Sequence, residues 1–138
     1  MRYLGLDLGS RTLGVAVSDK TGIIASNVKT IHHNEDYDDL VQDVCDLVRE
    51  YEVDAIVLGF PKNMNDTIGP KGELSIDFKG KLESVLEIPI YLQDERLSTK
   101  SATDMLISGN VSRKKRKGVV DSVAATIILQ TYLDRRVD

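Results

Sequence analysis

Apolar and polar residues alternate at the start of the chain, a pattern that predicts β-structure. Leucines at every second position share one face of a strand that spans Tyr3 to Leu8, because successive side chains of a strand point to opposite sides. Turn residues then alternate with two further apolar runs, so the first thirty residues predict an antiparallel three-stranded meander. The second and third strands are expected at 13–18 and 23–30, after turns at 9–11 and 19–22.

The hydrophobic period then changes from two residues to that of a helix. Apolar residues between Asp38 and Tyr51 recur with the spacing of one face of an α-helix. The continuous apolar run at 55–59 is typical of a buried strand that follows a crossover helix. The remaining predicted elements are a helix at 74–85, a strand at 90–93, a helix from Ser98 to Gly109 and a last helix with its stripe at 120–133.

The element order βββαβαβαα predicts an α/β fold. It requires a mixed five-stranded sheet in which the first three strands are antiparallel and later strands are added by helical crossovers, with helices on both faces. A length of 138 residues is typical of one domain, so residues 1–138 are expected to form a single domain.

Charge and cysteine content narrow the classes of function. The 18 basic and 22 acidic residues give a formal net charge of −4, which ordinarily disfavours a polyanionic partner. One cysteine, Cys45, cannot form an internal disulfide, and no Cys or His residues stand at zinc-binding spacing. No apolar run approaches the ~18 residues that span a bilayer, and no signal-peptide pattern begins the chain. We therefore expect a cytoplasmic protein with no membrane partner.

Three acidic positions stand where the pattern predicts apolar or structured surroundings. Asp7 lies inside an apolar strand, where an uncompensated carboxylate is costly, although Arg11 or the amides of the following turn could satisfy it. Asp94 and Glu95 follow the fifth strand, where they could instead form surface ion pairs with Arg96. Asp121 is expected at the start of the last helix, where the helix dipole favours a carboxylate in any protein.

These acids would converge if the first and fifth strands lie in one sheet and the last helix crosses their carboxyl ends. Carboxylates that share a pocket repel one another unless divalent cations lie between them. Hard oxygen ligands suit Mg²⁺ or Mn²⁺, and two such ions can promote phosphodiester cleavage without a protein nucleophile. The adjacent His32 and His33 point in opposite directions in an extended chain, so they are poor co-ligands.

The basic residues of the chain are strongly segregated. Residues 113–117 are five consecutive cations, expected as a loop ahead of Asp121, and the rest of the chain has 13 basic and 22 acidic residues, a net charge of −9. Such a run is either a solvated surface or a contact for a nucleic-acid backbone. The connection from Phe60 to Glu73 is longer than usual and is either a mobile surface loop or a second contact, through Lys62, Asn63, Asn65 and Lys71.

Four motifs follow one another along the chain, namely Gly5–Arg11, Gly59–Pro61 with Gly69, Asp94–Thr99 and Arg116–Ala125. Through these motifs the chain resembles, nearly from end to end, the YqgF family of small bacterial RNase H-like nucleases. Members of this family are assigned either Holliday junction resolution, by likeness to RuvC, or maturation of pre-16S rRNA.

The resemblance implies an RNase H-like fold and a set of site residues. Asp7, Glu95 and Asp121 would be the catalytic acids that bind two Mg²⁺ or Mn²⁺ ions, and it is the family that selects Glu95 over Asp94. The candidate substrate-binding residues are Arg11, Lys62, Asn65, Arg96, Arg113, Lys114, Lys115, Arg116 and Lys117.

The expected function is metal-dependent hydrolysis of phosphodiester bonds in structured nucleic acid. Processing of the 5′ end of pre-16S rRNA is favoured, with a four-way DNA junction as the alternative substrate and a non-catalytic nucleic-acid-binding module as a further alternative. A monomer suffices for a single cut in RNA, whereas junction resolution requires a symmetric homodimer. An ATP-binding phosphotransferase of related fold is disfavoured because such enzymes close two domains over the nucleotide.

Overall fold

The protein forms a single mixed sheet with helices on both of its faces. A computed structural model describes residues 1–9, 11–60, 69–94 and 113–135, with the backbone alone at 113–122. Its elements are β1 (Tyr3–Leu8), β2 (Thr12–Ser18), β3 (Ala25–His32), α1 (Tyr37–Glu50), β4 (Ala55–Phe60), α2 (Pro70–Glu83), β5 (Ile90–Asp94) and α4 (Arg113–Arg135).

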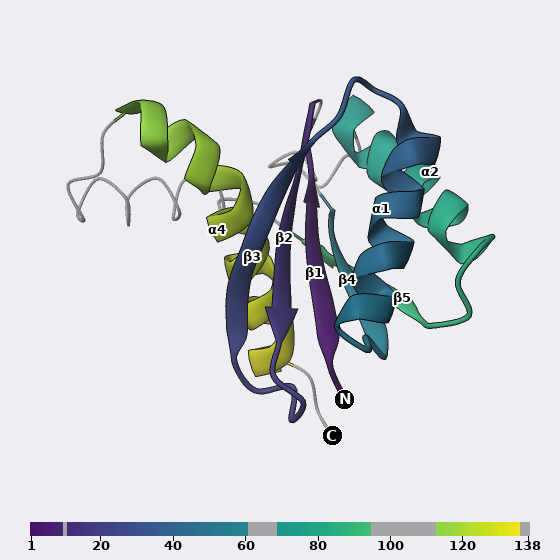
Figure 1. Ribbon diagram of the computed structural model, residues 1–138, viewed down its shortest axis with the longest axis vertical. Helices are drawn as coiled ribbons and strands as arrows, with labels where there is room; N and C mark the ends of the chain where they lie inside the picture. The colour runs from purple at the N-terminus through teal and green to yellow at the C-terminus, as the bar shows by residue number, and fades with distance from the viewer. Residues whose placement is uncertain (10, 61–68, 95–112, 136–138) are drawn as a thin grey trace.

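The sheet has the strand order β3-β2-β1-β4-β5 (Figure 1). The first three strands pair antiparallel, whereas β1 pairs parallel with β4 and β4 with β5. Strands β1, β4 and β5 therefore end at the same edge of the sheet. The predicted mixed five-stranded sheet, with its antiparallel meander and helical crossovers, is confirmed.

Two hydrophobic clusters cover the two faces of the sheet. One face carries the alternate leucines of β1 and packs against α1 and α2, where Phe78 and Leu82 are fully buried. The other face carries Tyr3, Ala16 and Val57 and packs against α4. The period-two pattern of β1 thus divides its side chains between two cores, as the sequence predicted.

Helix α4 approaches β1 most closely at Gly5. A Cβ atom at Gly5 would lie 2.7 Å from the Cβ of Leu129 and 3.1 Å from the carbonyl oxygen of Ala125. The ring of Tyr132, one turn later, stands 5.8 Å from the ring of Tyr3. The later residue of α4 thus contacts the earlier residue of β1, so the helix runs antiparallel to the strand. The residues before Ala125 therefore extend toward the carboxyl end of β1.

Two predicted boundaries are wrong, each for a local physical reason. The third strand begins at Ala25 because the amides of Ile23 and Ile24 donate to the carboxylate of Asp19, which extends the turn. The connection after β4 ends at Gly69 because Pro70 begins α2, and proline is favoured in a first helical turn. Lys71, expected in this connection, lies exposed in α2.

The basic run was expected as a loop, and this expectation is wrong. Residues 113–117 form the beginning of α4, which continues through Gly118 to Arg135. Lys and Arg are strong helix formers, and a single glycine costs a helix only about 1 kcal/mol, too little to end it. The helix predicted from Ser98 to Gly109 lies outside the described residues. In the described part of the chain, helices are too short or too polar to span a membrane.

Candidate active site

Asp7 lies near the carboxyl end of the central strand β1, on the face that α4 covers. Its side chain is partly buried, and it shares this face with Tyr3 and Gly5 because strand residues alternate. An ionisable residue at the end of a parallel strand occupies the edge at which open α/β sheets bind their ligands. The interpretation of Asp7 as a site residue stays a prediction, and this is the position from which it is argued.

Glycines flank Asp7 on both neighbouring strands. Gly14 of β2 is its antiparallel partner, and Gly59 of β4 is level with it because Leu6 pairs with Leu58 one residue earlier. Neither neighbour contributes a side chain beside the carboxylate. On the α4 face, the two strands beside β1 therefore place only glycines level with Asp7.

Gln93 is the next polar side chain in this row across the sheet. It pairs with Gly59, so Asp7, Gly59 and Gln93 lie level on three adjacent strands, with a spacing of about 4.8 Å between strands. Gln93 is buried, and its amide nitrogen donates weakly to the carbonyl oxygen of Asp94 at 3.2 Å. The sequence analysis did not single out Gln93, although the alternation of 90–94 could have placed it.

Asp94 lies on the opposite face from Asp7. It pairs with Phe60 and follows Leu92 by two residues, and Leu92 packs on the α1 and α2 side of the sheet. The register therefore separates Asp94 from Asp7 and Gln93. Of the two acids that the residues alone left open, Asp94 is the one whose strand position points away from Asp7.

Asp121 does not begin the last helix, contrary to expectation. It lies in the third turn of α4, whose first turn contains no acidic residue, so the helix dipole does not account for a carboxylate at this position. Its backbone stands one turn before Ala125, the residue that contacts Gly5. Because α4 runs antiparallel to β1, this step along the helix leads in the direction of Asp7.

Arg11 is exposed on the turn that follows β1. The turn is tight: the amide of Gly9 donates to the carbonyl oxygen of Thr12 at 2.7 Å. A cation on this turn stands at the same edge of the sheet as Asp7, where it is accessible to a phosphate group. The role of Arg11 as a substrate contact stays a prediction.

The other predicted site residues lie beyond what the structure describes. Among the described side chains, groups of three or more His, Cys, Asp or Glu residues that could hold a metal ion are absent. Of the described donors, the Asp7 carboxylate and the Gln93 amide oxygen are hard oxygen ligands, which fit Mg²⁺ or Mn²⁺. Glu95, Arg96, Lys62 and Asn65 lie outside the described residues, as do the side chains of Asp121, Arg113, Lys114, Lys115, Arg116 and Lys117.

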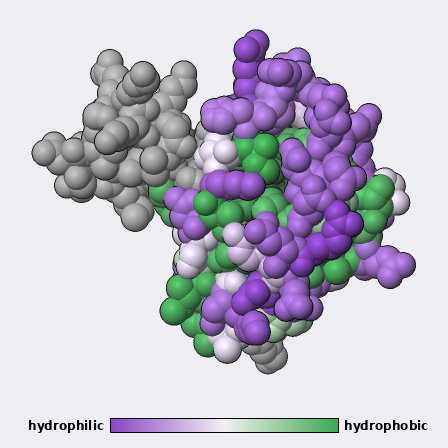
Figure 2. Space-filling view, in the orientation of Figure 1, coloured by the Kyte–Doolittle hydropathy of each residue, from purple (hydrophilic) through white to green (hydrophobic). Residues whose placement is uncertain are grey.

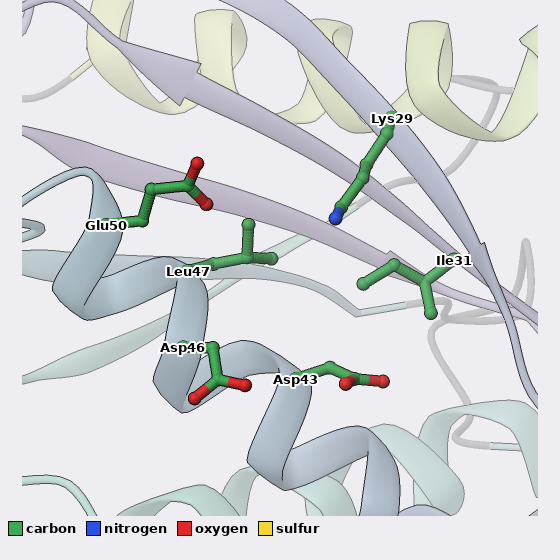
Figure 3. Close-up of a pocket in the computed structure, with 6 residues that line it drawn as sticks. All are labelled: Lys29, Ile31, Asp43, Asp46, Leu47 and Glu50. Atoms are coloured by element: carbon green, nitrogen blue, oxygen red, sulfur yellow. The ribbon is translucent and has the colours of Figure 1, made fainter.

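A shallow groove between β3 and α1 is acidic, in contrast to the basic run at 113–117 (Figure 3). Lys29 points from β3 toward the acidic side of α1, and Ile31 and Leu47 supply the apolar part of the lining. Figure 2 shows predominantly hydrophilic residues over α1 and its surroundings. The carboxylates that line the groove are Asp43, Asp46 and Glu50.

The acidic character extends to the beginning of α1. The neighbouring charge of Asp36 raises the pKa of Asp39 above its usual value, because two carboxylates at the helix start repel each other. Such a surface repels a polyanion.

Comparisons with known proteins identify the family of the chain. A family model described as "RuvX: Holliday junction resolvase" matches residues 1–135. A Geobacillus sp. (strain WCH70) protein named "Putative pre-16S rRNA nuclease" is 53% identical over 137 residues, which cover 99% of both chains. A Bacillus subtilis (strain 168) protein with the same name is 53% identical over 135 residues, covering 97% of this chain and 98% of its own.

Solved structures show likeness in fold. The structure described as "T. thermophilus RuvC in complex with Holliday junction substrate" superposes with a TM-score of 0.60 at 13% sequence identity. It covers 98% of this chain and 97% of the RuvC chain. RuvC has an RNase H-like fold, so the comparison confirms the fold class that the sequence predicted.

Proposed function

The chain belongs to the RuvX family of Holliday junction resolvases, and from this premise we propose that it is a metal-dependent nuclease that processes the 5′ end of pre-16S rRNA in the bacterial cytoplasm. Family membership makes it a hydrolase of ester bonds in nucleic acid. The observation that carries the proposal is the placement of Asp7, flanked by Gly14 and Gly59, at the carboxyl end of β1 under α4. Residues 1–138 are proposed as one nuclease domain.

Three carboxylates are proposed to form the catalytic centre. Asp7, Glu95 and Asp121 would hold two Mg²⁺ or Mn²⁺ ions, which when bound activate a water molecule and stabilise the leaving oxygen. Support comes from the position of Asp7, from the orientation of Asp94 toward the other face, and from the place of Asp121 one turn before the contact with Gly5. The amide oxygen of Gln93 would accept a hydrogen bond at the rim of this centre.

Basic residues on the same side are proposed to hold the phosphate backbone. Arg11 stands exposed beside the carboxyl end of β1, and residues 113–117 extend along the first turns of α4. Phosphate contacts of this kind position a substrate without reading its sequence. Lys62, Asn65 and Arg96 are proposed as further contacts.

A four-way DNA junction is the second candidate substrate. It is supported by the family description and by likeness to the RuvC chain solved with a Holliday junction. The pre-16S rRNA is preferred because relatives about half identical over nearly their whole length bear the name of an rRNA nuclease, whereas the RuvC chain is 13% identical.

Cleavage of two labelled substrates tests the proposal. The purified protein is incubated with Mg²⁺ and either a precursor that contains the 5′ end of 16S rRNA or a four-way DNA junction. We expect cleavage of the precursor, and the Asp7→Asn protein should lose about 10²-fold or more in rate while it folds normally. Glu95→Gln should lose activity to a similar degree.

Two matched variants serve as controls. Asp94→Asn changes the acid on the opposite face, and Asp43→Asn changes an exposed acid of α1, so both should retain activity. Undiminished cleavage by Asp7→Asn at equal Mg²⁺ would refute the catalytic assignment. Cleavage of the junction but not of the precursor would replace the substrate with the alternative.

A further inference from the structure

His33 lies between β3 and α1 and is the buried neighbour of the exposed His32. Its backbone amide donates to the carbonyl oxygen of Arg11 at 2.9 Å, which continues the pairing of β2 with β3 by one residue. Its side chain is 9% exposed. A buried imidazole needs partners for both ring nitrogens, and those partners fix its protonation.

Both ring nitrogens of His33 have backbone partners. The amide of Glu35 donates to Nδ1 at 3.1 Å, so Nδ1 is the accepting nitrogen of the ring and Nε2 is the donating one. Nε2 stands 3.2 Å from the carbonyl oxygen of Gly9 and therefore donates to it. Both ring nitrogens of His33 are thus engaged by the backbone.

These bonds attach the turn after β1 to another part of the fold. Gly9 stands two residues after Asp7, and Arg11 ends the same turn, so His33 holds both ends of the turn through its ring and its amide. The ring of Tyr37 packs on His33 at 5.3 Å and on Phe78 of α2 at 6.4 Å. The turn thus rests on a side chain that is itself fixed by the core of the α1 and α2 face.

We propose that His33 is a positioning residue for the active site: its Nε2–H···O bond to Gly9 holds the turn that carries Arg11 in the orientation required for cleavage. The inference rests on the proposed function, since it presumes that Asp7 and Arg11 act on a phosphodiester substrate. His33 does not touch substrate and acts through the backbone of Gly9. A small displacement of such a turn is sufficient to lower a rate, because catalysis depends on near-attack geometry.

Two isosteric substitutions separate the two bonds of the ring. The amide nitrogen of glutamine reaches the position of Nε2, so His33→Gln keeps the donor to Gly9 and loses the acceptor for Glu35. The oxygen of asparagine reaches the position of Nδ1, so His33→Asn keeps the acceptor and loses the donor. Each variant loses one neutral hydrogen bond, so the two should be destabilised to a similar extent.

The experiment measures cleavage of the precursor, thermal stability and hydrogen exchange of backbone amides in the three proteins. We expect His33→Asn to lower kcat about tenfold with little change in KM, and His33→Gln to remain within about threefold of wild type. The Gly9 amide should exchange faster in His33→Asn than in His33→Gln. His32→Asn, which changes the exposed neighbour, should resemble wild type in every measurement.

Three results would overturn the inference. The first is equal activity of His33→Asn and His33→Gln, the second is equal exchange at Gly9, and the third is an imidazole ¹⁵N spectrum of the wild-type protein with a protonated Nδ1. The exchange and the spectrum do not require cleavage. If the wild-type protein cleaves neither nucleic acid, the proposed function fails, while those two measurements still decide whether His33 holds the turn.

Discussion

At the scale of single residues, Asp19 shows how one carboxylate can set the boundary of a strand. The Thr21 hydroxyl and the amides of Ile24 and Ile23 donate to it, and these hydrogen bonds hold the pKa of Asp19 well below its usual value of 3.8. The carboxylate is thus the form that the folded turn prefers. Because the unfolded chain lacks these donors, the bonds contribute their full stabilisation only above the pKa of Asp19 in the unfolded chain, and this stabilisation is lost progressively below that pKa.

The stability contributed by Asp19 should therefore depend on pH in a defined direction. A lowered pKa in the folded state stabilises above the ordinary carboxyl range, and this contribution is lost as the pH falls below about 4. Asp19→Asn should be less stable than wild type at pH 7, and the difference should shrink between pH 5 and pH 2. Urea unfolding at a series of pH values measures it, and a difference that stays constant with pH would contradict this account.

Single residues also mark what the sequence could and could not predict of the site. The residue pattern identified Asp7 as anomalous because a carboxylate inside an apolar strand stands out. It could not choose between Asp94 and Glu95, because that choice depends on the register of β5 against β4. Gln93 was missed although the alternation of 90–94 could have placed it, and His33 was missed because its ring contacts the carbonyl oxygen of Gly9, 24 residues away in sequence.

At the scale of elements, the contact between α4 and β1 decides how the helix lies over the site. The strand can approach the helix backbone only because Gly5 has no side chain, with Ala125 and Leu129 directly above it. The sequence predicted a helix here but placed its start too late, since the basic run and Gly118 were interpreted as a solvent-exposed loop although Lys and Arg favour helices. The outcome is a helix of 23 residues, about 34 Å long.

Gly5→Ala should therefore displace α4 as well as weaken its packing. The added methyl group would stand 2.7 Å from the Cβ of Leu129, so the helix must shift, and overpacking of this kind costs about 1–3 kcal/mol. Cleavage should fall further than stability alone explains, because the helix carries Asp121. Urea unfolding and the rate of precursor cleavage, measured on the same preparation, test both parts.

Gly80 of α2 offers the matched control for this substitution. A Cβ at Gly80 meets no atom within 4 Å, so Gly80→Ala should stabilise the protein by about 0.5–1 kcal/mol through the lower entropy of the unfolded chain. Its activity should not change. A Gly5→Ala protein as stable and as active as wild type would show that α4 can move without affecting the site.

At the scale of the whole molecule, charge is divided between the two sides of the sheet. The groove between β3 and α1 is acidic, and the cationic run lies at the beginning of α4 on the other face. A net charge of −4 therefore averages over segments of opposite charge. The sequence predicted the segregation of basic residues along the chain and the layered fold, because these depend on local composition and on the hydrophobic period. The relative position of the two charged segments depends on the topology of the sheet.

Neutralising the cationic run should weaken binding in a salt-dependent manner. Replacing Arg113–Lys117 by glutamine should lower affinity for the precursor and reduce the slope of log affinity against log salt by about 0.7–0.9 for each phosphate that the protein no longer neutralises. Fluorescence anisotropy at 50–200 mM salt measures both quantities. Unchanged affinity would reduce the run to a solvated surface. A second variant serves as the control. In it, glutamine replaces four cations that lie on or near the α1 and α2 side, namely Lys29, Arg49, Lys79 and Lys81.

The alternation of β1 has a consequence for how this protein can vary. Leu4, Leu6 and Leu8 belong to one core, whereas Tyr3, Gly5 and Asp7 face α4 and the site. Mutations in the first core and in α1 and α2 can adapt the protein to a different growth temperature. They can therefore accumulate without contacting the reacting groups. Adaptation of stability and conservation of chemistry can thus proceed on the two faces of one six-residue strand.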